Sequence, residues 1–186
     1  NHSMKWENHL QKSLAMTKQR GRAITRMYLK SSSRAITSAL QVYRLQVQSA
    51  ALYSAELWGY HHLTNLTVSE NNFVRSLLTL PISTPLLPLY WDLNLKQIKP
   101  LAALRPLLYW IRLWRTPELH VYRLCLQEVL DLKINITWLT YIKTWLTDLG
   151  LKDYWLYPDS LPTNASMILK TQFWKSYYDQ VLSNSN

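Results

Sequence analysis

Apolar residues recur at alternating spacings of three and four along nearly the whole chain, and this period most limits what the chain can fold into. The spacing runs from Trp6 to Tyr28 in the first segment and from Ile36 to Trp58 in the next. Three glycines in 186 residues argue against a hairpin-rich β fold and against a glycine-rich phosphate loop. We therefore expect an all-α fold, an irregular multi-helix bundle with a long N-terminal helical hairpin.

Prolines, glycines and a serine run divide this pattern into helices. The first helix is expected to end at the serines at 31–33, and the later ones at 34–61, 68–80, 95–115, 117–130, 137–149 and 163–182. Gly59 and Gly150 are expected to terminate helices, and Pro106 is expected to break or kink one. We predict two domains, a helical domain over 1–116 with a basic first helix and a C-terminal helical extension over 117–186.

Positive charge is concentrated in the N-terminal quarter of the chain. The net charge is +10, and residues 1–44 hold nine lysines and arginines against one acid, Glu7. Such segregation favours a polyanionic partner, either nucleic acid or an anionic membrane surface. Since the apolar stripe of the first helix is interrupted by Thr17 and Gly21, we expect it to insert poorly into lipid.

Four of these cations follow every fourth residue, so they project from one side of the first helix, roughly opposite its apolar stripe. The predicted nucleic-acid-binding residues are Lys18, Arg22, Arg26, Lys30 and, as an extension, Arg34, with Arg44 as a further candidate. A helical row of cations can meet successive phosphates of a nucleic-acid strand. The other interpretation is an ordinary solvated face, against which the absence of interleaved acids argues.

Catalysis by the isolated chain is not expected. Polymerase-type phosphoryl transfer needs carboxylates close enough to share two metal ions, and the six aspartates are scattered. They are Asp92, Asp131, Asp148, Asp153, Asp159 and Asp179. Cys125 is the single cysteine, and the adjacent His61 and His62 point about 100° apart on a helix, so we expect no metal site and no cofactor.

The sequence contains neither a signal peptide nor a segment that reads as membrane-spanning. No apolar run of signal-peptide length opens it, and the uncharged stretch 76–91 is broken by Pro81, Pro85 and Pro88. We expect no membrane span and an intracellular protein, in nucleus or cytoplasm, that is not secreted. Because Asn1 is not an initiator methionine, we expect a piece of a longer reading frame.

Two groups of residues have competing structural and functional interpretations. Glu56 lies among apolar residues, and we predict that its carboxylate pairs with an arginine or a tryptophan N–H and has no catalytic role. The helically spaced aromatic residues favour core packing over stacking on bases. They are Tyr109, Trp110, Trp114, Trp138, Trp145, Trp155 and Trp174.

Three segments in fixed order resemble the region just downstream of the polymerase palm in non-LTR (LINE-type) retrotransposon reverse transcriptases. The first matches a Leu-Tyr-x-x-Glu-Leu-Trp-Gly pattern at 52–59, and the second matches Phe-x-Arg-x-Leu-Leu-x-Leu-Pro-x-x-Thr-Pro at 73–85. The third matches Arg-x-x-x-Tyr-Trp-x-x-Leu at 105–113, after Asp-Leu-Asn-Leu at 92–95 where the family has Glu-Leu-Gly-Leu. The resemblance covers most of residues 6–115 and is weak beyond 116.

The resemblance implies a thumb-like domain of an RNA-directed DNA polymerase, which grips the template–primer duplex and performs no chemistry itself. Its expected partners are RNA or an RNA–DNA duplex, bound without sequence preference, and the palm region of the parent polymerase. Alternatives are a non-enzymatic helical protein-interaction module, a decayed retroelement remnant, or a membrane-surface protein.

Overall fold

The structure is a computed structural model and describes residues 6–29, 34–60 and 64–183. Those residues form helices and no strand, which confirms the all-α class. The chain divides into two compact units. Unit 1 comprises 1–54 and 61–101, and unit 2 comprises 55–60 and 102–186.

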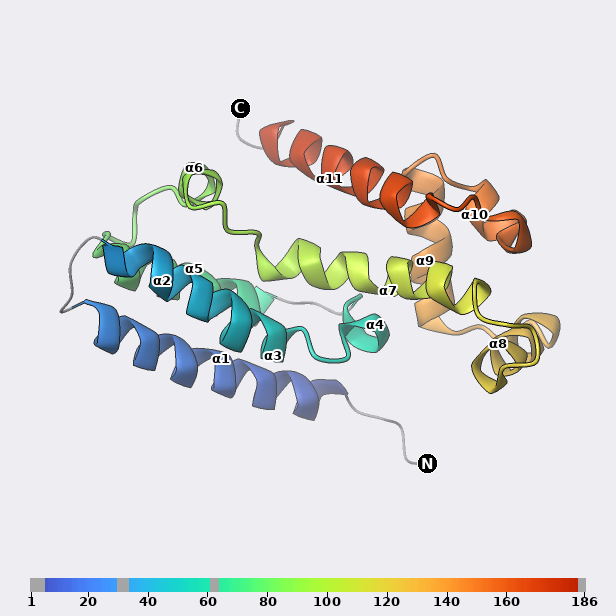
Figure 1. Cartoon of the computed structure of the whole chain (residues 1–186), viewed down its shortest axis with the longest axis horizontal. Helices are drawn as coiled ribbons and strands as arrows, with labels where there is room; N and C mark the ends of the chain where they lie inside the picture. The colour runs from blue at the N-terminus through green and yellow to red at the C-terminus, as the bar shows by residue number, and fades with distance from the viewer. Residues whose placement is uncertain (1–5, 30–33, 61–63, 184–186) are drawn as a thin grey trace. The chain divides into compact units, whose positions relative to one another are not determined.

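Unit 1 is built around the predicted helical hairpin. Its elements are α1 (Trp6–Tyr28), α2 (Arg34–Val42), the π-helix η1 (Tyr43–Gln48), α3 (Ser49–Ala51), α5 (Thr64–Leu78) and α6 (Leu87–Asp92). α1 packs along α2, η1 and α3 and also along α5, and the chain reverses direction between α1 and α2 (Figure 1). The long helix predicted over 34–61 is wrong in its extent: it changes to π geometry at Tyr43, ends at Ala51, and Ser54 adopts a left-handed φ of 55°.

The core of unit 1 gathers apolar side chains from α1, α2, η1, α5 and α6. Tyr43 of η1 stacks on Phe73 of α5 with ring centroids 4.0 Å apart and planes 10° apart. The buried members are Ile24, Ala39, Leu40, Tyr43, Val47, Phe73, Val74, Leu77, Leu86, Tyr90 and Leu95. Burial of this many apolar side chains is the main term that holds the helices together.

A fully buried carboxyl group lies beside this core. Glu70 of α5 accepts hydrogen bonds from the Gln48 side-chain amide (3.0 Å) and from the backbone N–H of Ile98 (2.8 Å). Gln48 also donates to the carbonyl of Lys96 at 2.6 Å. Burial raises the pKa of Glu70 to about 7, because desolvation of the carboxylate outweighs these hydrogen bonds.

Unit 2 holds the remaining elements. They are α4 (Ala55–Trp58), most of α7 (Ile98–Trp114), α8 (Val121–Asp131), α9 (Thr137–Asp148), α10 (Asp153–Leu156), the 3₁₀ helix η2 (Pro158–Ser160) and α11 (Ala165–Ser183). The helix α7 continues past Pro106. The predicted domain boundary after residue 116 differs from the observed division, which falls within α7 and assigns α4 to unit 2.

Contacts between α4 and later segments explain that division. The Glu56 carboxylate pairs with Arg105 at 3.1 Å, which confirms the predicted pairing. Trp138 Nε1–H also donates to the backbone carbonyl of Glu56 at 2.8 Å. Gly59 packs so tightly that a Cβ there would lie 2.1 Å from the carbonyl oxygen of Ala102. Glycine is therefore required at position 59 because the backbone of Ala102 approaches it closely, and not because the chain makes a left-handed turn there.

The aromatic residues of unit 2 form its core, as predicted. Trp110 is 1% exposed, stacks on Trp155 with centroids 4.9 Å apart, and donates its Nε1–H to the carbonyl of Tyr154 at 3.0 Å. Trp114 is buried beside it. The other predicted aromatic residues, Tyr109, Trp138, Trp145, Trp155 and Trp174, are partly buried and pack against the same core.

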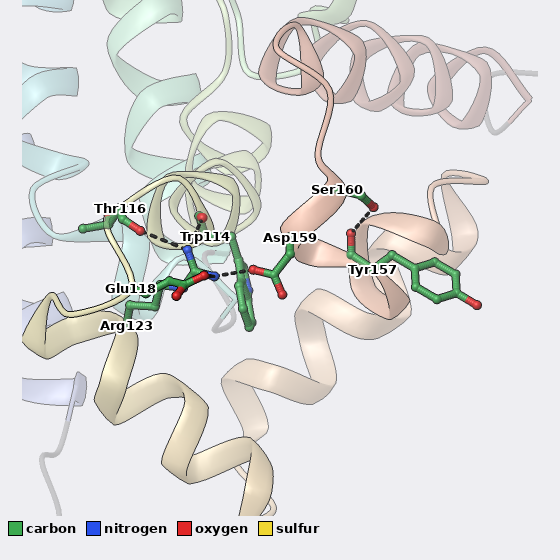
Figure 2. Close-up of polar contacts among 7 residues, drawn as sticks. All are labelled: Trp114, Thr116, Glu118, Arg123, Tyr157, Asp159 and Ser160. Carbon is green, nitrogen blue, oxygen red and sulfur yellow. Dashed lines mark hydrogen bonds and ion pairs between the residues drawn. The ribbon is translucent and has the colours of Figure 1, made fainter.

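A buried arginine links the end of α7 and the segment after it to η2 through hydrogen bonds and an ion pair. Figure 2 shows the guanidinium of Arg123, a residue of α8, directed to backbone carbonyls and to Asp159. Nη1 donates to the carbonyls of Trp114 (2.9 Å) and Thr116 (3.0 Å), and Nη2 pairs with Asp159. The guanidinium carbon also lies 5.0 Å from the centroid of the Trp114 ring, in cation–π geometry.

Candidate nucleic-acid interface

A groove of about 630 Å³ runs between α1 and α5 within unit 1. α1 contributes Lys18, Arg22 and Arg26 to one wall. Since a helix rises 1.5 Å per residue, these cations are spaced about 6 Å apart along the axis. The sequence therefore identified a stripe of cations, and the fold places three of its members on a concave surface.

The three cations are available to a ligand. Lys18, Arg22 and Arg26 are all exposed. None of them has an ion-pair or hydrogen-bond partner among the residues that the structure describes. Among the described residues that line the groove there is no aspartate or glutamate. Three uncompensated positive charges therefore face the same space.

The opposite wall comes from α5 and is polar without charge. Ser69, Asn72 and Ser76 line it, spaced three and four residues apart and therefore on one face of the helix. Asn72 and Ser76 are exposed, whereas Ser69 is buried. Hydroxyl and amide groups can both donate and accept hydrogen bonds, whereas the lysine and arginine side chains of α1 can only donate them.

The floor of the groove is closed by close helix packing. Gly21 of α1 faces Phe73 of α5, and a Cβ added at Gly21 would lie 3.4 Å from Phe73 Cδ2. Thr17 and Thr25 are buried on the same side of α1 and also line the groove. Thr17 donates its hydroxyl hydrogen to the carbonyl of Ser13 at 2.8 Å. The polar residues that interrupt the apolar stripe of α1 thus form the bottom of the groove.

The other predicted cations are not among the described residues that line the groove. Lys30 lies outside the described residues, and Arg34 begins α2 with a side chain that the structure does not describe. Arg44 donates to the carbonyls of Leu93 (3.1 Å) and Asn94 (2.6 Å), so this further candidate has a structural role. Arg20 likewise donates to the carbonyl of Gln46 at 2.8 Å.

The charge of the whole chain is carried by the unit that contains the groove. Unit 1 holds twelve lysines and arginines and three acids, whereas unit 2 holds nine and eight. One of the three acids, Glu70, is fully buried and already accepts two hydrogen bonds. Unit 1 therefore presents a positive potential to solvent, which attracts polyanions.

The described residues offer neither a metal site nor a membrane-crossing helix. In the described part of the chain, no three His, Cys, Asp or Glu side chains come together as metal ligands would. His61 and His62 lie outside that part. Of the helices described, none combines the length and apolarity that a bilayer crossing demands.

Sequence reasoning missed the α5 wall. A signal for it exists, because Ser69, Asn72 and Ser76 repeat at helical spacing within the predicted helix 68–80. What the sequence lacks is any sign that this polar face of α5 packs beside the cationic side of α1.

Comparison with known protein families, curated proteins and solved structures found no match to this chain.

Proposed function

We propose that this chain binds nucleic acid without sequence preference, through contacts from unit 1 to backbone phosphates. The observation that carries the proposal is the groove that Lys18, Arg22 and Arg26 line with no acid among its described lining residues. Cations in such an arrangement neutralise phosphates and release counterions, which supplies most of the energy of non-specific binding. Phosphate contacts fix the position of the strand and carry no sequence information. The expected ligand is an RNA duplex or an RNA–DNA duplex.

The same proposal includes a place for the chain in a larger enzyme. It would be the thumb-like, post-palm region of a LINE-type reverse transcriptase, with the palm of the parent polymerase as its protein partner. In this assignment the chain grips the template–primer duplex, and the chemistry belongs to carboxylates elsewhere in the polymerase. The burial of Trp58, Phe73 and Trp110, which belong to the three resembling segments, supports a packing role for those segments.

Binding can be tested by fluorescence anisotropy of a labelled RNA–DNA hybrid. We expect the triple variant Lys18→Ala, Arg22→Ala, Arg26→Ala to bind roughly tenfold to a hundredfold more weakly than the wild type at moderate salt. The matched control removes three exposed lysines of unit 2, with the substitutions Lys143→Ala, Lys152→Ala and Lys170→Ala. Both variants lose the same net charge, so a difference between them reports the groove and not the overall charge.

The result that would contradict the proposal is equal loss of affinity in the two triple variants. Circular dichroism of both variants checks that their helical content is unchanged. Because all six substituted side chains are exposed, we expect both proteins to fold.

A second candidate function rests on a different surface. Four apolar side chains in and just before the first turn of α8 are strongly exposed, namely Leu119, Val121, Tyr122 and Leu124. Large apolar side chains exposed close together along the chain suit a protein–protein contact, as an interaction module would require. Light scattering over a concentration series would detect self-association through this patch, and Leu119→Asp with Leu124→Asp should abolish it. A constant monomer mass would count against self-association.

A further inference from the structure

The two walls of the α1–α5 groove differ in their hydrogen-bonding chemistry. Lys18, Arg22 and Arg26 on α1 can only donate hydrogen bonds. A backbone phosphate offers only acceptors, so the α1 wall is complementary to it. Asn72 and Ser76 on α5 can donate and accept, which suits a neutral group that does both.

The groove offers no platform for a base. Among the described lining residues Phe73 is the single aromatic one; it is 5% exposed, and its ring stacks on Tyr43. Binding of unpaired bases generally uses exposed aromatic faces. A strand in this groove would therefore present its sugars and phosphates to the protein, with its bases directed away.

Within a sugar–phosphate backbone, the 2′-hydroxyl of ribose is the neutral group that both donates and accepts hydrogen bonds. On this basis, which rests on the proposed function, we infer that Asn72 and Ser76 read the ribose 2′-hydroxyl and make the groove selective for an RNA strand over a DNA strand. The cations of α1 hold the phosphates in the same groove and set the overall affinity. Selectivity and affinity are thereby assigned to opposite walls.

The test compares two hybrids of identical sequence. One pairs an RNA strand with DNA, and the other pairs DNA with a strand whose 2′-hydroxyls are replaced by 2′-fluorine. Fluorine keeps the sugar conformation of RNA and cannot donate a hydrogen bond, so the comparison isolates the hydroxyl from the shape of the duplex. We expect the wild-type protein to bind the ribose hybrid roughly twofold to tenfold more tightly, as one or two hydrogen bonds would give.

The double variant Asn72→Ala, Ser76→Ala should bind both hybrids equally, with affinity close to that of the wild type for the fluorinated hybrid. Asn65→Ala is the matched control, because Asn65 is an exposed amide on the same helix that does not line the groove. The control should keep the wild-type preference. Substitution of these exposed side chains leaves the core of unit 1 intact.

Two outcomes would overturn the inference. The first is equal binding of the two hybrids by the wild type, and the second is an unchanged preference in the double variant. If the double variant binds both hybrids more weakly by the same factor, Asn72 and Ser76 contact phosphate and the inference also fails. In each case salt-sensitive binding through Lys18, Arg22 and Arg26 would persist, whereas failure of the proposed function would abolish binding of both hybrids.

Discussion

At the scale of single residues, Glu70 is a buried acid whose carboxyl group accepts hydrogen bonds and has a raised pKa. Its carboxyl is fully buried between Gln48 and the first turn of α7, where two donors reach its oxygens. Burial still raises the pKa of Glu70 from its ordinary value of 4.5 to about 7. The folded protein therefore holds the proton more tightly than the unfolded chain does, and the contribution of Glu70 to stability is largest at low pH.

This predicts that the free energy of unfolding falls as pH rises from about 5 toward 7, through the window between the two pKa values. The fall due to Glu70 is about 3 kcal/mol, because one pKa unit corresponds to about 1.4 kcal/mol. Urea unfolding followed by circular dichroism at pH 5 and pH 8 measures it. In Glu70→Gln, which cannot ionise, the difference should shrink by that amount. Equal pH dependence in the two proteins would contradict the assignment.

Arg123 is the second residue with a defined energetic role. Its guanidinium is held by two backbone carbonyls and by Asp159, and its side chain is 9% exposed. We expect Arg123→Ala to lower the free energy of unfolding by about 2–4 kcal/mol, because the carbonyls of Trp114 and Thr116 lose their charged donor. Asp159 is 67% exposed, so Asp159→Asn should cost less than about 1 kcal/mol. Similar losses in the two variants would show that the ion pair, and not the carbonyls, holds this segment.

At the scale of helices, substitution of the two buried glycines by alanine is expected to change stability in opposite directions. An added Cβ at Gly59 would collide with the carbonyl of Ala102, so Gly59→Ala should destabilise unit 2 by about 3 kcal/mol or more. At Gly21 the nearest atom is 3.4 Å away, and the helix interior favours alanine. Gly21→Ala should therefore stabilise α1 by about 0.5–1 kcal/mol. Thermal unfolding of both variants tests the pair, and a stabilising Gly59→Ala would contradict the packing described.

Much of the helical architecture could be predicted from the sequence, because apolar residues at helical spacing mark α1, α5, α7, α9 and α11. Helix ends were harder to predict. Thr79, Asn94 and Lys133 follow helix ends with φ of 54°, 47° and 51°, so these ends use left-handed residues without the glycine that signals them. The break after Ala51 was missed for a related reason, since Ser54 at φ 55° carries no such signal.

The sequence predicts one wall of the candidate site, the cations of α1, and does not predict the other wall on α5. The repeat of Lys18, Arg22 and Arg26 identifies the cationic side of α1 without any structure. The roles of Arg44 and of the α5 wall depend on which helices pack together, which local spacing does not reveal. Arg44 reaches carbonyls about fifty residues away, and Asn72 faces a helix fifty residues before it. Tertiary contacts of that range decide which cations remain free for a ligand.

At the scale of the whole molecule, the two units differ in their net charge and in the composition of their cores. Unit 1 carries most of the positive charge and the groove, whereas unit 2 is nearly neutral and holds the tryptophan core. We therefore expect a polyanion to bind unit 1, and substitutions in the core of unit 2 to alter stability more than affinity.

The salt dependence of nucleic-acid binding shows whether the α1–α5 groove grips a phosphate backbone. Anisotropy of a labelled RNA–DNA hybrid should be measured over a salt series with the wild type and with Lys18→Ala, Arg22→Ala, Arg26→Ala. We predict a log–log slope of affinity against salt that is flatter by about 2–3 in the variant, one phosphate contact being lost for each cation. An unchanged slope in a folded variant, or no binding by the wild type at low salt, would show that the groove does not hold phosphates.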